Sequence, residues 1–492
     1  MKENFKFLMS IIILKICLLF YIFNYQATII SDNFIEIFTT NDYSALLGPI
    51  NNFIENGTYE LENGSGVPYT GRLPGYIFPF IFFRYIFSVN TSILLLVIYQ
   101  IFFSIIASYL LFKIIKTISK NLYVSYLIFI IYNLFSFLIP WELWTVPESL
   151  SVSYYIISIY FLIKFFYESN KLKYLIFSGL FLAMVFFLRG FLFFNFLSVL
   201  LVFLFKYLNF NSIKYYLIFI FPFIFFESLW ITRNYISTDK FIPLTSFQVF
   251  NNIDVNLNKN YRFDDIYKPT VLKLRKLISC WGGVNVHFYK NSEMSFFLNN
   301  EKYINNVFPE WIFNCGISKE MLFEIQDLLN KSFDSSLSHS ERCIIEHELL
   351  NYIDNVINRF HYNSIFQSFL SRFSRVKNLI YNNVLADWPI GSFDSNNLIV
   401  KLYKLFILAI YMLSILLSLL AGFTHLILRF FNSQFNAILS IIFLNSIFVI
   451  FVFSFIIDVA EFKYSAIIFI NSIILCCFYF SKFLKIEDSS IN

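Results

Sequence analysis

Long apolar runs recur along this chain and alternate with short polar turns, except in one extended polar region. Several runs reach about 18 residues, the length that a helix needs to cross a ~30 Å hydrocarbon core. Each must be helical, because lipid offers no hydrogen-bonding partner to an open backbone. The pattern predicts about ten spans, at 7–25, 92–113, 122–139, 149–168, 174–188, 191–208, 214–231, 398–420, 435–457 and 463–482. We therefore expect an all-α, polytopic membrane protein.

Two apolar stretches depart from this simple pattern. Residues 77–88 are too few to cross a bilayer, so they predict an interfacial helix in the first outer loop. Residues 174–208 are long enough for two spans, but Arg189-Gly190 interrupts them. We expect two short helices that meet at the outer face.

The lysines predict the orientation of the spans. With the N-terminus in the cytoplasm, the short basic loops around Lys113–Lys120, Lys164–Lys173 and Lys206–Lys214 fall on the cytoplasmic side, as the positive-inside rule requires. The C-terminus then lies there too. The outer side receives the loop 26–91, the turn 140–148 and the polar region 232–396.

These boundaries divide the chain into three expected parts. Residues 1–231 form an N-terminal transmembrane module, 232–396 a large outer loop domain of mixed structure, and 397–492 the C-terminal transmembrane helices. Within the loops, the spacing of apolar residues predicts helices over 43–55 and 318–360.

Composition supports the membrane interpretation. The chain is 58% hydrophobic and only 14% charged, which is too little charge to cover the surface of a soluble protein of this length. Its net charge of +5 indicates no particular partner. No zinc-binding spacing of cysteines is present.

Ionisable residues gather in the segments expected at the outer face, where burial beside lipid would cost free energy. They are Asp42, Arg72, Glu142, Glu148, Arg189, Arg233 and Glu461. Each has a structural explanation, such as a helix cap for Asp42, a favourable helix dipole for Glu148, or an interface anchor for Arg72 and Arg233. Their joint placement suits a lipid-linked anionic substrate, because arginine binds phosphate and a carboxylate can abstract a proton.

The order of these motifs resembles the GT-C superfamily of membrane glycosyltransferases. The motifs that carry the resemblance are, in chain order, Asp42-Tyr43-Ser44-Ala45, Arg72-Leu73-Pro74-Gly75-Tyr76, Pro147-Glu148, Arg189-Gly190, Trp230-Ile231-Thr232-Arg233-Asn234-Tyr235 with Phe241-Ile242-Pro243-Leu244, and Glu461-Phe462-Lys463-Tyr464. The family 39-like branch, which includes the dolichyl-phosphate-mannose-protein mannosyltransferases and the lipid A aminoarabinose transferase, is the most similar. The resemblance covers most of residues 1–245 and the final span, and the motif at 230–244 is its most specific part. Glu148 stands where Asp is commoner.

The resemblance implies a GT-C-like helical bundle and an inverting transfer of a hexose-type sugar at the outer face. The donor would be a polyprenyl-phosphate sugar and the acceptor a glycan, lipid or protein. Asp42 would be the general base and Glu148 would position the acceptor, while Arg72, Arg189 and Arg233 would bind the donor phosphate. Supporting positions would be Tyr43, Tyr76, Asn234, Tyr235 and Glu461. The setting would be a bacterial inner membrane, with lipid as a partner and no nucleic acid.

No cofactor is expected from these motifs. Asn41-Asp42 supplies one carboxylate only, so a divalent metal is not supported.

Two other classes of protein remain alternatives. A polysaccharide polymerase or O-antigen ligase-type enzyme would place its catalytic residues in the large outer loop, where His287, His339, His347, His361, Arg342, Arg359, Arg372 and Arg375 lie. A non-enzymatic transporter of lipid-linked glycans would show inverted repeats or charges at mid-bilayer, neither of which the sequence displays.

Overall fold

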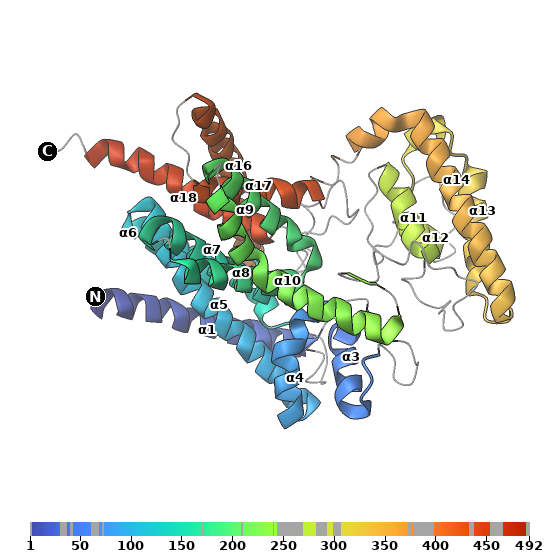
Figure 1. The fold of residues 1–492 in the computed structure, drawn as a ribbon, viewed down its shortest axis with the longest axis horizontal. Helices are drawn as coiled ribbons and strands as arrows, with labels where there is room; N and C mark the ends of the chain where they lie inside the picture. The colour runs from blue at the N-terminus through green and yellow to red at the C-terminus, as the bar shows by residue number, and fades with distance from the viewer. Residues whose placement is uncertain are drawn as a thin grey trace. The chain divides into compact units, whose positions relative to one another are not determined.

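The fold is helical throughout the part of the chain that the structure, a computed structural model, describes (Figure 1). The described residues are 2–29, 37–39, 43–60, 68–70, 73–169, 171–207, 210–239, 241–243, 269–281, 293–298, 307–371, 373, 376, 398–431, 437–452 and 466–488. Within these ranges there is no β-strand, and one isolated antiparallel bridge joins Glu60 and Pro68.

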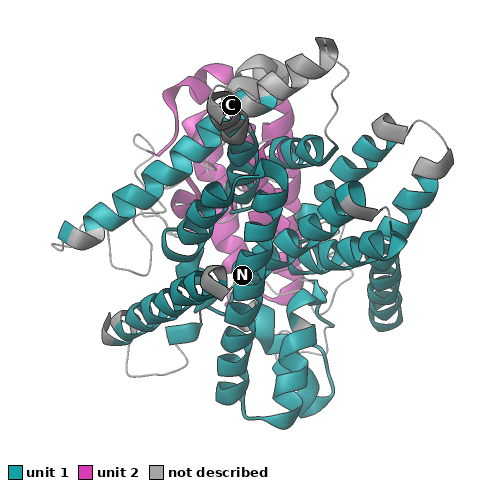
Figure 2. Cartoon of the chain, turned by 90° about the vertical axis from the view of Figure 1, so that its left-hand side faces the viewer, with its two compact units in different colours: residues 1–244, 383–449, 465–492 teal, residues 245–382, 450–464 magenta. Residues whose placement is uncertain are grey.

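The chain forms two compact units (Figure 2). Unit 1 comprises residues 1–244, 383–449 and 465–492, and unit 2 comprises residues 245–382 and 450–464. The C-terminal apolar helices therefore belong to the same unit as the N-terminal ones, whereas the sequence-based division treats 1–231 and 397–492 as separate parts.

Unit 1 contains the apolar helices. They and the short elements between them are α1 (Lys2–Ile29), α3 (Tyr43–Asn56), η1 (Pro74–Tyr76), α4 (Ile77–Ile86), α5 (Val89–Ser119), α6 (Leu122–Leu134), η2 (Ile139–Glu142), α7 (Pro147–Lys164), η3 (Phe165–Ser169), α8 (Leu172–Leu188), η4 (Gly190–Phe193), α9 (Phe194–Tyr207), α10 (Phe210–Thr238), α16 (Leu398–Phe431), α17 (Ala437–Phe451) and α18 (Ala466–Asp488).

Five of the helices in the described residues are long and apolar enough to cross a membrane. These segments are Phe5–Asn24, Val89–Ser119, Pro147–Tyr167, Ile213–Thr238 and Lys401–Leu420. Five shorter apolar segments accompany them in α6, α8, α9, α17 and α18. The architecture is that of an integral, multi-pass membrane protein.

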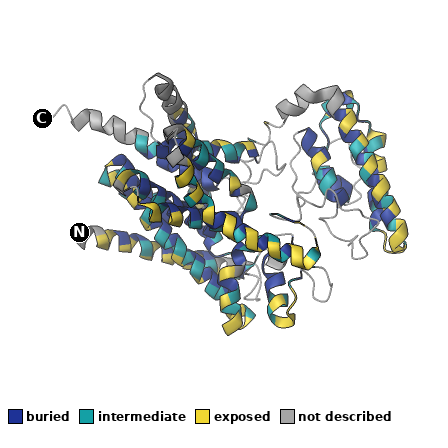
Figure 3. Ribbon diagram, viewed as in Figure 1, coloured by how far each residue is buried: buried dark blue, intermediate teal, exposed yellow. Residues whose placement is uncertain are grey.

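Helix α7 lies at the centre of unit 1 (Figure 3). In its most apolar stretch 78% of the residues are buried, against 28% for α1. Small side chains let its neighbours approach closely: Ser158 on α7 and Ser178 on α8 lie 3.0 Å apart, hydroxyl to hydroxyl. Serines are common at such helix contacts because they add hydrogen bonds without bulk.

Residues 135–146, named the outer turn after the side on which the sequence predicts them, replace the end of a predicted span. The sequence predicted a helix over 122–139, but α6 ends at Leu134 and only the short η2 follows before α7. Pro140 explains part of this difference, because proline lacks a backbone N–H and disfavours helix in the residue before it. Most of the outer turn is nevertheless buried. Irregular backbone is tolerated at such a place only where protein surrounds it and satisfies its polar groups.

The break at Arg189-Gly190 is confirmed, since α8 ends at Leu188 and α9 begins at Phe194. The end predicted for the span 214–231 is wrong: α10 continues to Thr238, so Arg233-Asn234-Tyr235 belongs to its last turns. The helix ends where Asp239 takes a left-handed φ of 53°. Such a residue commonly terminates a helix.

Unit 2 is helical in its described part, where the sequence predicted mixed structure. Its elements are α11 (Pro269–Cys280), α12 (Glu293–Leu298), η8 (Glu310–Cys315), α13 (Lys319–Phe333) and α14 (His339–Ser371). The helical pattern predicted over 318–360 is confirmed as α13 and α14. An apolar cluster around Leu274, Phe296, Ile325 and Ile353 forms the core.

A buried carboxylate joins two helices of unit 2. The Oε1 atom of Glu346 on α14 accepts hydrogen bonds from the hydroxyl and the backbone N–H of Thr270 on α11, at 2.6 and 3.3 Å. On the unit's exposed side, Tyr352 donates to Glu324, and burial together with this carboxylate raises the pKa of Tyr352 to about 12.

Gly179 provides a test of the central packing. A Cβ atom at this position of α8 would lie 1.9 Å from the carbonyl oxygen of Phe219 on α10. We expect Gly179→Ala to push the two helices apart and to lower stability by about 1–3 kcal/mol, as overpacking typically does. Thermal unfolding of the detergent-solubilised protein measures the effect. Ile176→Ala, on the exposed side of the same helix, is the control, and an equal melting temperature for both variants would contradict the tight α8–α10 contact.

Candidate functional site

The structure describes most of the predicted site residues. Glu148, Arg189 and Tyr76, and the neighbouring residues Arg233, Asn234 and Tyr235, lie in described segments. Asp42, Arg72 and Glu461 lie outside the described residues. Tyr43 is the first residue of α3, and its side chain is likewise outside the description.

Glu148 and Arg189 form a buried ion pair. Glu148 lies in the first turn of α7, directly after Pro147, a residue that suits the start of a helix. Arg189 caps the C-terminus of α8 with an extended backbone. An Oε1 atom of Glu148 accepts a hydrogen bond from Nη2 of Arg189, and the side chains are 5% and 8% exposed. Two residues far apart in sequence are therefore brought together, as the sequence predicted.

Tyr76 packs beside this pair. Its neighbour Gly75 lies so close to α8 that a Cβ atom would be 2.3 Å from the backbone carbon of Phe187, so only glycine fits. The ring of Tyr76 is 2% exposed, and its hydroxyl donates a hydrogen bond to Oε1 of Gln100 on α5. Tyr76 also interacts electrostatically with Glu148 and Arg189. Three segments of the chain thus meet at the N-terminal end of α7.

The segment just before Asp42 is attached to the same region. The carbonyl oxygen of Phe38 accepts two hydrogen bonds from Thr145, one from its backbone N–H at 2.8 Å and one from its hydroxyl at 2.9 Å. Thr145 is buried and stands three residues before Glu148. The outer turn is therefore joined to the chain that follows α1.

Arg233 lies in a second cluster, at the end of α10. Its guanidinium lies over the rings of Tyr59 and Trp230, 4.7 and 5.2 Å from their centroids. It donates to the carbonyl oxygen of Tyr69 and to Oδ1 of Asn234, both at 2.9 Å. These contacts hold together the two sides of the Glu60–Pro68 bridge.

The two neighbours of Arg233 have different surroundings. Asn234 is buried and donates to the carbonyl oxygen of Ile242 at 3.1 Å, which turns the chain back after α10. Tyr235 is exposed. Phosphate binding by Arg233 stays a prediction.

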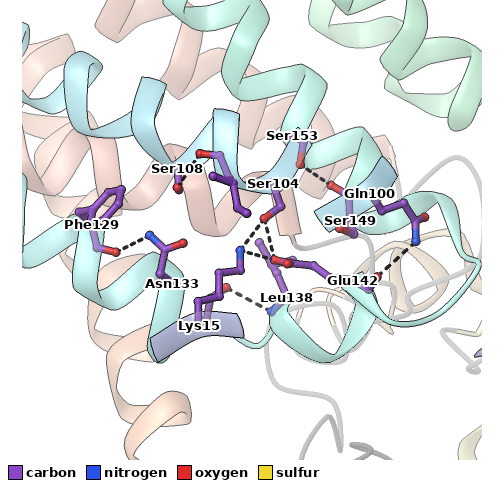
Figure 4. A network of polar contacts seen from close by, with 12 residues as sticks. Lys15, Gln100, Ser104, Ser108, Phe129, Asn133, Leu138, Glu142, Ser149 and Ser153 are labelled. Carbon is purple, nitrogen blue, oxygen red and sulfur yellow. Dashed lines mark hydrogen bonds and ion pairs between the residues drawn. The ribbon is translucent and has the colours of Figure 1, made fainter. Parts of the chain in front are cut away.

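Lys15 and Glu142 form a further buried ion pair that the sequence interpretation missed (Figure 4). Lys15 Nζ lies 2.8 Å from Glu142 Oε1 and donates to the hydroxyl of Ser104 at 2.7 Å. Ser104 donates in turn to the same Oε1 atom, also at 2.7 Å. The available signal was a lysine inside the apolar run 7–25, since an ionisable residue there needs a partner. Burial raises the pKa of the Glu142 carboxyl, and the nearby Lys15 ammonium opposes that effect.

Each of the two buried glutamates keeps one carboxylate oxygen available. Within the described part of the chain, Oε2 of Glu142 and Oε2 of Glu148 have no hydrogen-bond partner. A buried acceptor without a partner is costly, so it favours a ligand that donates a hydrogen bond. The described residues contain no group of three or more His, Cys, Asp or Glu side chains placed to hold a metal ion.

A double-mutant cycle tests the buried pair. Arg189→Leu leaves Glu148 buried and uncompensated, and we expect a loss of about 3–5 kcal/mol in stability. Adding Glu148→Leu removes the lone charge and should restore much of that loss. Thermal unfolding in detergent measures all three variants. Strictly additive effects would contradict a direct interaction, and Lys331→Met at the exposed Lys331–Asp327 pair of unit 2, which should change stability little, is the control.

The buried groups at the N-terminal end of α7 can accept a proton, bind a hydroxyl group and offer positive charge. Glu148 supplies the acceptor oxygen, Arg189 the charge, and Tyr76 a further polar group beside them. Comparison with protein-family models, curated proteins and solved structures found no match to this chain.

Proposed function

We propose that this protein is a membrane glycosyltransferase that moves a hexose-type sugar from a polyprenyl-phosphate donor to a glycan, lipid or protein at the outer face. The observation that carries the proposal is the buried Glu148–Arg189 pair with Tyr76 beside it. A carboxylate and a guanidinium held together in a dry site suit a reaction in which a hydroxyl loses a proton while a phosphate departs.

The reaction needs few groups. A carboxylate takes the proton of the acceptor hydroxyl, whose oxygen attacks the anomeric carbon from the side opposite the phosphate. The bond from that carbon to the phosphate oxygen breaks, the configuration inverts, and polyprenyl phosphate leaves with the electron pair. Asp42 is the proposed base. Glu148, through its available Oε2 atom, orients the acceptor hydroxyl.

Arginine would stabilise the departing phosphate. The burial of Arg189 supports this role, because a buried guanidinium would interact strongly with a developing negative charge. Arg72 and Arg233 are proposed to assist. The Phe38–Thr145 contact supports the assembly, since it joins the chain leading to Asp42 with the chain leading to Glu148.

The first outer loop offers a place for the lipid part of the donor. Helix α4 has ten residues, so it is about 15 Å long and too short to span a ~30 Å core. Phe82, Tyr85 and Ile86 are exposed on it, whereas Arg84 is bound to Asn51 and Glu55 of α3. We propose that this aromatic side lies in the membrane interface, where the polyprenyl chain would enter the site.

The full topology is part of the proposal. About ten spans, with both termini in the cytoplasm, would leave the loop 26–91, the turn 140–148 and the region 232–396 on the outer side of the membrane. A bacterial inner membrane is the proposed setting.

A transfer assay tests the function. The protein is reconstituted in lipid nanodiscs with a panel of radiolabelled polyprenyl-phosphate hexoses and with detergent extracts of bacterial envelopes as acceptors. We expect label to move to the acceptor and polyprenyl phosphate to be released. Asp42→Asn should slow transfer by about 100- to 10,000-fold, the range usual for removing a general base, and Arg189→Gln should slow release of the phosphate.

The controls separate this proposal from the alternatives. His347→Ala, in unit 2, should leave transfer unchanged; a loss as large as that of Asp42→Asn would favour a polymerase or ligase that uses the outer loop. Wild-type protein that transfers no sugar from any donor of the panel would refute the proposal and favour a transporter.

A further inference from the structure

The buried Lys15–Glu142 pair has no part in the proposed reaction, yet it lies close to the residues that do. We propose that Lys15 and Glu142 are positioning residues, which hold the outer turn so that Glu148 stays paired with Arg189 and presents its second oxygen to the acceptor. This inference rests on the proposed function for the meaning of that geometry.

The outer turn is anchored to α1 and α5. Lys15 on α1 and Ser104 on α5 both bind Oε1 of Glu142, the last residue of η2, at 2.8 and 2.7 Å. All three side chains are at most 2% exposed. A buried lysine beside lipid has strong reason to keep this partner, because an unpaired ammonium there is expensive.

Gln100 links the outer turn to Tyr76. Gln100, one turn of α5 before Ser104, donates through Nε2 to the carbonyl oxygen of Trp144 at 2.9 Å and to that of Glu142 at 3.4 Å. Its Oε1 atom accepts the hydroxyl of Tyr76. Gln100 lies beside Glu142 (Figure 4), and its one amide binds the backbone on both sides of Leu143 as well as the hydroxyl of Tyr76.

Glu148 follows the outer turn closely along the chain. The outer turn leads directly into α7 through Thr145, which is held by Phe38, and Val146, the N-cap residue. Glu148 lies in the first turn of α7, and no side-chain hydrogen bond caps that helix start. The orientation of this first turn is thus set by the outer turn, and through it by Lys15.

The alternative is a purely structural role, in which the Lys15–Glu142 pair only stabilises the bundle. The two roles differ in one respect. A purely structural pair can be replaced by apolar residues of similar size with little consequence, whereas a positioning pair cannot, because the geometry at Glu148 would relax.

The experiment measures the state of Glu148 directly. Dicyclohexylcarbodiimide, an apolar reagent, modifies protonated carboxyl groups inside membranes, and a carboxylate held by a guanidinium resists it. The protein in nanodiscs is treated with the reagent, and labelling of Glu148 is followed by peptide mass spectrometry in wild type, Lys15→Met/Glu142→Leu and Gln100→Leu. We expect labelling to rise about ten-fold in both variants, the factor that ~1.4 kcal/mol of lost pairing produces. Lys15→Arg should keep the wild-type rate.

The matched control is Tyr155→Phe, which removes a buried interhelical contact of α7 to Asn471 and Asn445 without touching the outer turn. It should lower the melting temperature and leave Glu148 labelling unchanged. Gln100→Leu carries the test if the double variant does not fold, because it alters no charge. Unchanged labelling of Glu148 in folded Gln100→Leu, or in the folded double variant, would overturn the inference.

A kinetic readout separates this inference from the proposed function. Where the panel identifies a donor, the double variant should lower kcat about 100-fold, as a ~1 Å misplacement can, with little change in KM. If labelling of Glu148 rises in the variants as expected but the wild-type protein transfers no sugar, the geometric link is retained and only the glycosyltransferase proposal is rejected.

Discussion

Charges buried in an apolar helical bundle must be paired with one another, because neither lipid nor hydrocarbon side chains can solvate them. Two such pairs, Glu148–Arg189 and Glu142–Lys15, stand at the two ends of the same short segment. Glu142–Lys15 joins η2 to α1, and Glu148–Arg189 joins the start of α7 to the end of α8. The buried turn between the two glutamates is therefore fixed at both ends by polar contacts inside an apolar bundle.

This dependence gives the site its chemical character. Glu148 and Arg189 neutralise each other, so the site can remain dry before a substrate enters. A hydroxyl and a phosphate would then interact with groups that are already oriented, and little free energy would go into rearranging solvent. Tyr76, which follows the tightly packed Gly75 and donates a hydrogen bond to Gln100, lies near the pair. The same rigidity would be a disadvantage in a transporter, which must change its shape.

Hydrophobic periodicity predicted much of this fold. Local signals in the sequence were sufficient to predict three features: the helix at 43–55, the helices within 318–360 and the break at Arg189-Gly190. The outer turn was missed, because residues 135–139 are as apolar as a span and only the tertiary contacts of Gln100, Ser104 and Thr145 show that irregular backbone is satisfied there. The sequence predicted that Glu148 and Arg189 lie near one another, but not that they pair directly. The partner of Lys15 could not be predicted, because several outer carboxylates were equally suitable on sequence alone.

The Lys15–Glu142 contact also bears on how the protein is made. A ribosome delivers α1 to the membrane before α3, α4, α5 and α6 exist, and Glu142 comes after all of them. Until then the first helix carries an uncompensated cation among lipid tails, which costs about 2.5–3.5 kcal/mol on insertion scales. The cation in α1 is therefore compensated only when the turn after α6 has been made, so that residues from the middle of the chain complete the polar contacts of a much earlier helix.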